Sequence, residues 1–450
     1  MSTHLKWIAG INGLALMIVL SVTSSAEAAL PPGNPVQQWN KIAEDTVLAA
    51  GALQNEALLY MSYESAAVYD AVIAIAGGYE PYASRIPAAA SASIDAAVIE
   101  AAYQILVHYF PAQTATLSTF HGEALAAVND ASVPDGIAVG AAAAEAVIHL
   151  RGTALHPLDG RLPIGTVSTI EDPTCKAGGY RRTPGGNWTL GPQTPWLGEV
   201  TPFLLQKAGQ FHAPAPPPLS SERWVEQVEE IRRVGSTESE SHGQRSAAQS
   251  AVALFWTSNV LRQYNLLGRD IITQHHSGTR ESARLLAMIN MVAADAQINV
   301  FHAKYELLFW RPVTAIDPTS VVPDWCGTLP GFDDRNDRTT EQIGWRPLLP
   351  TPNQPEYPSA HGSITSAIAD VLAEFLGSDA IGVTIHGSAD GTPGNLAATR
   401  YYATTADLRD EIVNARLWGG LHYRESTEAA VALGAKVAHF ALNHGLQPAH

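Results

Sequence analysis

The sequence has few charged residues, and only a minority of those are basic. Asp, Glu, Lys and Arg make up 16% of the 450 residues, and 27 Lys and Arg stand against 43 Asp and Glu, which gives a net charge of −16 at pH 7. Nucleic acids and anionic lipids attract proteins through an excess of Lys and Arg, so this balance argues against both as partners. Any anion that the protein binds must therefore be held by a local basic cluster.

Cysteine is equally scarce, since Cys175 and Cys326 are the only two. A structural zinc site needs more such ligands at close spacing, so we do not expect one. In an oxidising compartment the pair would be able to form one disulfide. Their spacing does not show whether they meet, and the question stays open at this point.

Long apolar runs are absent except near the N-terminus, where Lys6 precedes the run from Trp7 to Val22. A small-x-small cleavage pattern, Ala26-Glu27-Ala28, follows this run. We predict that residues 1–28 are a signal peptide and that the mature protein is secreted or periplasmic. The alternative is a membrane anchor, for which the run is short and contains Asn12. We expect no other stretch to span a membrane, and the oligomeric state is open.

Strand-like alternation of useful length and repeats at solenoid period are also lacking, whereas apolar residues recur at helical spacing. Ser93 caps one expected helix and Pro111 ends it. Gly, Pro and Thr dominate residues 156–219, which predicts an irregular connection. The hydrophobic fraction of 46% predicts a globular chain. We therefore predict an all-α fold in residues 29–450, with helices near residues 94–110, 136–150, 224–231, 280–311, 359–376 and 427–443.

Within that fold we expect a first helical part over residues 29–155. The irregular connection of residues 156–219 follows, and a second helical bundle over residues 220–450 carries the active site. All chemically suggestive residues lie in this last part.

The first suggestive segment carries Lys304 and Arg311, followed by Pro312. Residues seven apart on a helix lie two turns apart on nearly the same face, so both cations would reach one anion. Pro312 disfavours helix at Arg311 and so predicts that this arginine lies at a helix end. Taken alone, such a pair is more typical of a solvated helix face.

The second segment is Ser359-Ala360-His361, at the expected start of a helix. Free backbone N–H groups and the helix dipole at such a start attract an oxyanion. His361 would lie beside that anion as an acid or base that titrates near neutral pH. The plainer interpretation is a capping serine followed by a surface histidine.

The third segment holds Arg416 and His422, six residues apart, with Gly419-Gly420 between them. Six residues do not share one helical face, but the two glycines can interrupt the helix and turn His422 back toward Arg416. Together the three segments offer three cations, two histidines, a serine and a helix N-terminus. Guanidinium groups of this kind suit a small, highly charged tetrahedral anion.

The three segments read K-x6-RP (Lys304 to Pro312), PS-A-H (Pro358 to His361) and R-x5-H (Arg416 to His422). This pattern resembles the vanadium-dependent haloperoxidases, which share their site with the type 2 phosphatidic acid phosphatases and bacterial acid phosphatases. The run from Asp295 to Pro312 is closer to the chloroperoxidase branch, and the resemblance covers roughly Asp295 to Ser426. It implies two four-helix bundles packed in one domain, with long irregular connections.

The resemblance also implies roles for individual residues. His422 would coordinate vanadium, while vanadate oxygens would be held by Lys304, Arg311, Ser359, Arg416 and the backbone N–H of Ala360. His361 would deprotonate hydrogen peroxide, and Lys304 would polarise the bound peroxide. A halide would then leave as hypohalous acid, with or without an organic acceptor, and phosphate would be able to occupy the same site.

Three residues depart from the family pattern. Ala360 stands where the family usually has Gly, so its methyl group narrows the approach to the anion. Ser426 stands four residues after His422, where Asp is frequent, which weakens the expected orientation of His422. Gln354 stands where haloperoxidases tend to have Phe or His, so the halide remains open.

Two other functions fit the same residues. In a phosphatase, His422 would attack the phosphorus of a phosphomonoester and form a phosphohistidine, while His361 would protonate the leaving group. In a non-catalytic helical protein, the segments would only bind an anion, an alternative favoured by Ser426. The His275-His276 pair and the histidines near the C-terminus have no further potential ligands at metal-binding spacing, so we do not expect a metal site there.

Overall fold

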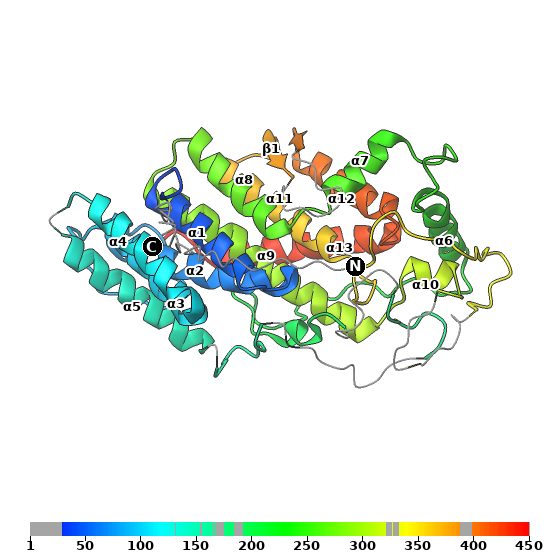
Figure 1. Cartoon of the computed structure of the whole chain (residues 1–450), viewed down its shortest axis with the longest axis horizontal. Coiled ribbons are helices and arrows are strands. Elements are labelled where there is room, and N and C mark those ends of the chain that lie inside the picture. Colours follow the sequence, from blue (N-terminus) through cyan, green and yellow to red (C-terminus); the bar gives the residue numbers. More distant parts are fainter. Residues whose placement is uncertain are drawn as a thin grey trace, which may run out of the picture.

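The computed structural model describes residues 29–130, 132–153, 155–164, 166, 175–183, 192–320, 326, 333–387 and 398–449. The predicted signal peptide, residues 1–28, lies outside the described residues. The described chain is mainly helical (Figure 1). Its helices are α1 (Pro35–Ala49), α2 (Gln54–Ala76), α3 (Ile94–Tyr109), α4 (Thr114–Ala127), α5 (Val133–Arg151), α6 (Glu222–Val234), α7 (Ala247–Phe255), α8 (Val260–Gln274), α9 (Thr279–Leu307), α10 (Pro312–Ile316), α11 (Ala360–Leu376), α12 (Thr405–Trp418) and α13 (Arg424–His444), with short 3₁₀ turns at Pro111–Gln113 and Pro195–Glu199.

The long helix α9 runs through the middle of the molecule (Figure 1). It packs against α2 on the side of the N-terminal helices and against α11 and α13 on the other side. Most of its residues are buried. Apolar side chains from α1, α2, α3, α8, α9 and α11 join one continuous core. The C-terminal end of α9, which carries Lys304, is thus fixed by packing on both sides.

The expected helix ends match the structure at several residues. The Ser93 side chain accepts a hydrogen bond from the backbone N–H of Ala96, and α3 begins at the next residue. Ser359 caps α11 in the same way, and α11 ends before Gly377, which adopts a left-handed conformation. A serine hydroxyl satisfies a backbone N–H that the helix itself leaves unpaired, which is why these sequence signals succeed.

The all-α prediction needs one correction, because the described residues also contain a two-stranded antiparallel sheet. Strand β1 (Val383–His386) pairs with β2 (Thr399–Tyr402), with Val383 opposite Tyr402 and His386 opposite Thr399. Each strand has only four residues, which is too short for a period-2 pattern to stand out. The fold is mainly helical, and the two-bundle division and domain boundaries expected from the sequence remain predictions.

A second correction concerns Arg311, which does not share a helical face with Lys304. Helix α9 ends at Leu307, and Leu308 takes a left-handed conformation with φ 46°. The chain then continues in extended form, because Tyr180 donates its backbone N–H to Leu308 and Trp310 donates to Gly178. Arg311 is the N-cap residue of α10, so it precedes a different helix and does not end the helix of Lys304 as predicted.

Helices α11 and α13 approach each other closely through two glycines. A Cβ on Gly434 would lie 2.0 Å from the carbonyl oxygen of Ser363, and a Cβ on Gly362 would lie 2.9 Å from Thr427 Cγ2. A larger residue at position 434 would require a backbone shift, and one at position 362 would press on Thr427. The close approach sets the start of α11 beside the start of α13.

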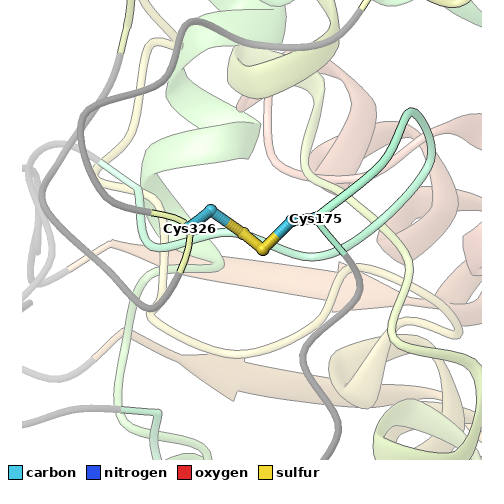
Figure 2. Close-up of a disulfide and its surroundings, with 2 residues drawn as sticks. All are labelled: Cys175 and Cys326. Atoms are coloured by element: carbon cyan, nitrogen blue, oxygen red, sulfur yellow. A yellow bond between two sulfur atoms is a disulfide. The ribbon is translucent and has the colours of Figure 1, made fainter.

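Cys175 and Cys326 form a disulfide, with their Cα atoms 5.6 Å apart (Figure 2). The bond joins positions 151 residues apart. It therefore ties the irregular region that precedes α6 to the chain that follows α10. The question left open by the sequence is answered in favour of the bond.

By length and composition alone, three helices are apolar enough to cross a membrane, which the sequence analysis did not anticipate: α2, α5 and α9. In this fold the most apolar windows of α2 and α9 are 89% and 94% buried, whereas that of α5 is 33% buried. The hydrophobicity of α2 and α9 is accounted for by their central place in the core.

Candidate active site

The three segments singled out in the sequence meet in one place. Lys304 comes from the end of α9, and Ser359 and His361 come from the start of α11. Arg416 lies in the last turn of α12, and His422 lies in the turn between α12 and α13. Arg311 joins them from the N-cap of α10. Lys304, Arg311, Ser359, Ala360, Arg416 and His422 are all buried, and His361 is partly exposed.

Lys304 is held by the chain that leads into α11. Its Nζ donates hydrogen bonds to the carbonyl oxygens of Pro355 and Glu356, at 2.7 and 3.0 Å. Burial, reinforced by the nearby Arg311, holds the pKa of Lys304 well below its usual range. An anion bound beside this ammonium group would favour its charged form.

Arg311 links the same chain to the third segment. Its Nε donates to the carbonyl oxygen of Gln354 at 2.9 Å, and its Nη1 donates to that of Leu421 at 3.0 Å. The same Nη1 lies 3.1 Å from Nε2 of His422. The guanidinium group therefore contacts Nε2 of the histidine that the resemblance assigns to vanadium.

Arg416 and His422 come together as the two glycines predicted. Helix α12 ends at Trp418, and Gly420 adopts a positive φ of 73°. The backbone N–H groups of Leu421 and His422 both fold back onto the carbonyl oxygen of Arg416. A Cβ on Gly420 would lie 2.4 Å from the carbonyl oxygen of Gly235, so both its conformation and its surroundings require glycine.

The start of α11 supplies backbone donors. Ser359 Oγ accepts the backbone N–H of Gly362 at 3.5 Å, and the backbone N–H of Ser359 donates to the carbonyl oxygen of Ser426. The adjacent Ala360 lies at the first turn and lines a pocket together with His361. The helix N-terminus therefore faces the cluster and adds partial positive charge to it.

Sequence reasoning missed Glu356. Its Oε1 lies 2.8 Å from Nδ1 of His422 and accepts the backbone N–H of Tyr423 at 3.1 Å. The carboxyl group is fully buried, and burial raises its pKa to about 7 although Arg311 and Lys304 oppose the rise. The one available signal was a carboxylate three residues before Ser359, next to a recognised motif.

Both histidines are strongly biased toward the neutral form. Burial is the largest cause of the low pKa of His361, followed by the charge of Arg416. For His422 the pKa is likewise held well below its usual range by burial and then by Arg311. The pKa of Arg416 falls to about 9 through burial and the neighbouring Arg311. These shifts share a cause, which is positive charge gathered in a buried place.

Several polar atoms of this cluster lack a hydrogen-bond partner within the described residues. They include Arg311 Nη2 and Arg416 Nε, both buried. Buried guanidinium N–H groups are costly to leave unpaired, so the site is incomplete by itself. A tetrahedral oxyanion would supply both the missing acceptors and the missing negative charge. The residues present therefore fit vanadate, and they fit phosphate equally well.

A pocket of about 440 Å³ leads to this cluster. Ala360 and His361 line it where it meets the cluster. Elsewhere its lining is rich in uncharged polar side chains: Gln54, Asn55, Gln193, Gln297, Thr351, Asn353 and Gln354. Gln354 uses its backbone oxygen to hold Arg311 and is one of the residues that line the pocket. Access to the site thus runs past His361.

The other histidine candidates stay outside this site. His275 and His276 are exposed at the C-terminal end of α8. His439 and His444 lie on α13, where His439 contacts Asn443 and His444 contacts the backbone of Phe440. Within the described ranges, no group of three or more His, Cys, Asp and Glu residues is arranged to hold a metal ion.

Residues 284–449 match a family model described as the second helical-bundle domain of VCPO, the vanadium chloroperoxidase. The vanadium chloroperoxidase of Curvularia inaequalis is 25% identical over 205 residues, which cover 40% of this chain and 32% of that protein. The sequence match thus spans about a third of the length of that relative.

Solved structures extend the likeness to nearly the whole chain. A bacterial vanadium-dependent iodoperoxidase superimposes with a TM-score of 0.71 at 21% identity, covering 94% of this chain and 100% of that one. The holo form of a bacterial vanadium-dependent chloroperoxidase gives 0.66 at 16% identity, covering 93% and 97%. At these identities the structures establish a shared fold.

Fold and site together define a mainly helical protein with a buried cationic pocket built from its C-terminal part. The sequence matches to that part agree with the motifs that carry the pocket. Residues 284–449 are thus similar in sequence to the second helical-bundle domain of a vanadium chloroperoxidase, and nearly the whole chain shares its fold with solved vanadium-dependent iodo- and chloroperoxidases.

Proposed function

We propose that the protein is a vanadate-dependent haloperoxidase that oxidises halide with hydrogen peroxide to hypohalous acid. The observation that carries the proposal is the gathering of the charges of Lys304, Arg311 and Arg416 around His422, whose Nε2 lies 3.1 Å from Arg311 Nη1. Within the described residues, buried guanidinium N–H groups of Arg311 and Arg416 are left unpaired. Such a site is built for an oxyanion that also accepts a nitrogen ligand.

In this proposal the residues of the cluster hold vanadate. Arg311 and Arg416 donate their free N–H groups to its oxygens, together with Lys304, Ser359 and the backbone N–H of Ala360. Nε2 of His422 is the single nitrogen ligand. Bound vanadate would supply a Lewis-acidic centre that activates peroxide toward attack by halide.

His361 is the proposed base for hydrogen peroxide. It is the one partly exposed member of the set, at the inner end of the pocket. Its low pKa keeps the ring neutral, so the ring is ready to accept a proton. Lys304, fixed by the two backbone carbonyl oxygens, would place its ammonium group against the peroxide as negative charge develops there.

The pocket is the proposed route for halide, peroxide and any organic acceptor. Residues with amide and hydroxyl groups line it, and Gln354 is among them where haloperoxidases tend to have Phe or His. Halide preference is therefore a property to measure in this chain, with iodide, bromide and chloride in turn.

We further propose that the protein is exported. The N-terminal apolar segment and the disulfide between Cys175 and Cys326 support this, because such bonds persist in oxidising compartments. Fractionation of the producing cells tests it, and a full-length protein retained in the cytosol would contradict it.

The enzymatic test compares protein freed of bound anion, the same protein with orthovanadate, and the same protein with phosphate. We expect peroxide-dependent halogenation of a phenol only with vanadate, and its loss in His361→Ala. The exposed His275→Ala is the matched control and should keep full activity.

Two outcomes would favour the other functions. Hydrolysis of a phosphomonoester without vanadate, and no halogenation, would identify a phosphatase. Tight binding of vanadate and phosphate with neither reaction would identify a non-catalytic anion-binding protein. Either outcome would overturn the haloperoxidase proposal.

A further inference from the structure

The contacts around His422 fix which of its ring nitrogens carries the hydrogen and which accepts. Nδ1 lies 2.8 Å from Glu356 Oε1, and Nε2 lies 3.1 Å from Arg311 Nη1. A guanidinium nitrogen can only donate, so Nε2 must accept. The neutral ring then carries its hydrogen on Nδ1 and directs it to the carboxyl oxygen of Glu356.

The backbone confirms that Glu356 Oε1 is an acceptor at this place. Tyr423 donates its backbone N–H to the same oxygen at 3.1 Å. Two N–H groups from adjacent residues therefore converge on one carboxyl oxygen. Such a pair holds the imidazole ring at a fixed angle to the chain that carries it.

Glu356 is itself fixed from three directions. Its backbone N–H donates to the carbonyl oxygen of Phe309 at 2.9 Å, and its own carbonyl oxygen accepts from Lys304. Its side chain is fully buried, and burial raises the pKa of the carboxyl group to about 7, although the neighbouring Ser426 opposes the rise. One residue thus connects the end of α9, the start of α11 and the start of α13.

We propose that Glu356 is the positioning residue of this site: by accepting the Nδ1 hydrogen of His422, it holds Nε2 toward the bound anion. The proposal rests on the proposed function, since it assigns His422 as the ligand. It also explains how the chain can have Ser426 where the family often has Asp. The carboxylate reaches the ring from the segment before α11.

The test uses two substitutions of Glu356 and measures binding instead of turnover. Glu356→Gln keeps an acceptor oxygen for both N–H groups, whereas Glu356→Ala removes it. We expect the affinity for orthovanadate, measured by calorimetry on the full chain, to fall about 10- to 100-fold in Glu356→Ala. Glu356→Gln should stay within about threefold of the parent protein, since an amide oxygen accepts as well.

Glu425→Gln is the matched control, because Glu425 is another buried carboxylate at the start of α13 and pairs with Arg223, outside the site. Its vanadate affinity should equal that of the parent. Thermal unfolding of every variant shows whether each is folded. Nitrogen NMR of the parent protein should show the Nδ1–H form of His422.

Equal vanadate affinity in the parent and in Glu356→Ala would overturn the proposal, as would an Nε2–H form of His422. An equal loss of vanadate affinity in Glu356→Gln and Glu356→Ala would also overturn it. The affinity would then depend on the charge of Glu356 and not on its acceptance of the hydrogen bonds. If the parent itself binds neither vanadate nor phosphate, the proposed function fails instead. The two failures are thus distinguishable.

Discussion

Replacement of Gly434 by alanine sets two opposing effects against each other. In the interior of a helix, alanine is favoured over glycine by about 0.5 to 1 kcal/mol. At position 434, however, the added Cβ would lie 2.0 Å from the carbonyl oxygen of Ser363 and 2.9 Å from its Cα. Backbone atoms cannot rotate away, so α11 and α13 must separate, and overpacking of this kind costs about 1 to 3 kcal/mol. We expect Gly434→Ala to lower the free energy of unfolding by about 1 kcal/mol or more.

The consequence should reach the site, because Ser359 hydrogen-bonds the backbone of Ser426 across the same pair of helices. Denaturant unfolding measures the stability, and phosphate titration measures the site. Gly122→Ala on α4 is the control, since its Cβ would have nothing within 4 Å and the change should stabilise the protein slightly. A Gly434→Ala variant as stable as the Gly122→Ala variant, with unchanged phosphate affinity, would refute the reasoning.

Three further changes test other parts of the account. Arg416→Lys removes the unpaired Nε and with it one or two charge-assisted hydrogen bonds to the anion. The affinity for phosphate, measured by calorimetry, should therefore fall about 10- to 100-fold. The control Arg409→Lys should leave this affinity unchanged. Glu64, whose pKa burial raises to about 8 in the folded protein, binds a proton that the unfolded chain releases nearer pH 4.5. The unfolding free energy should therefore fall as pH rises between these values, by up to about 1.4 kcal/mol per pH unit, and a Glu64→Gln variant that keeps this slope would contradict the assignment. Cys326→Ser removes the disulfide to Cys175 and should lower the free energy of unfolding, measured with denaturant, by about 2 to 5 kcal/mol. An unchanged unfolding midpoint would show that the bond does not stabilise the protein.

Local chemistry made part of the fold predictable from the sequence. Ser93 and Ser359 were recognisable caps because a serine before an apolar helical pattern has one main use. Gly419-Gly420 predicted the turn that returns His422 to Arg416, since Gly420 does adopt a positive φ. In each case the signal and its structural effect lie within a few residues of each other.

Features that depend on distant contacts were not predictable in this way. Arg311 leaves the helix of Lys304 because the segment around Gly178 and Tyr180 pairs with the chain after α9. Glu356 acts on a histidine 66 residues away in sequence, and no periodicity relates the two. The carboxylate that the family often has at position 426 is absent here, and a carboxylate from another segment, Glu356, lies beside the same histidine.

In the proposed function, one tetrahedral anion is enclosed by Lys304, Arg311, Ser359, Arg416 and His422. A crystal structure of the protein with orthovanadate tests it most directly. We predict vanadium bonded to Nε2 of His422, with vanadate oxygens accepting hydrogen bonds from Arg311 and Arg416. Vanadate bound elsewhere, or a saturated crystal with no density beside His422, would contradict the claim.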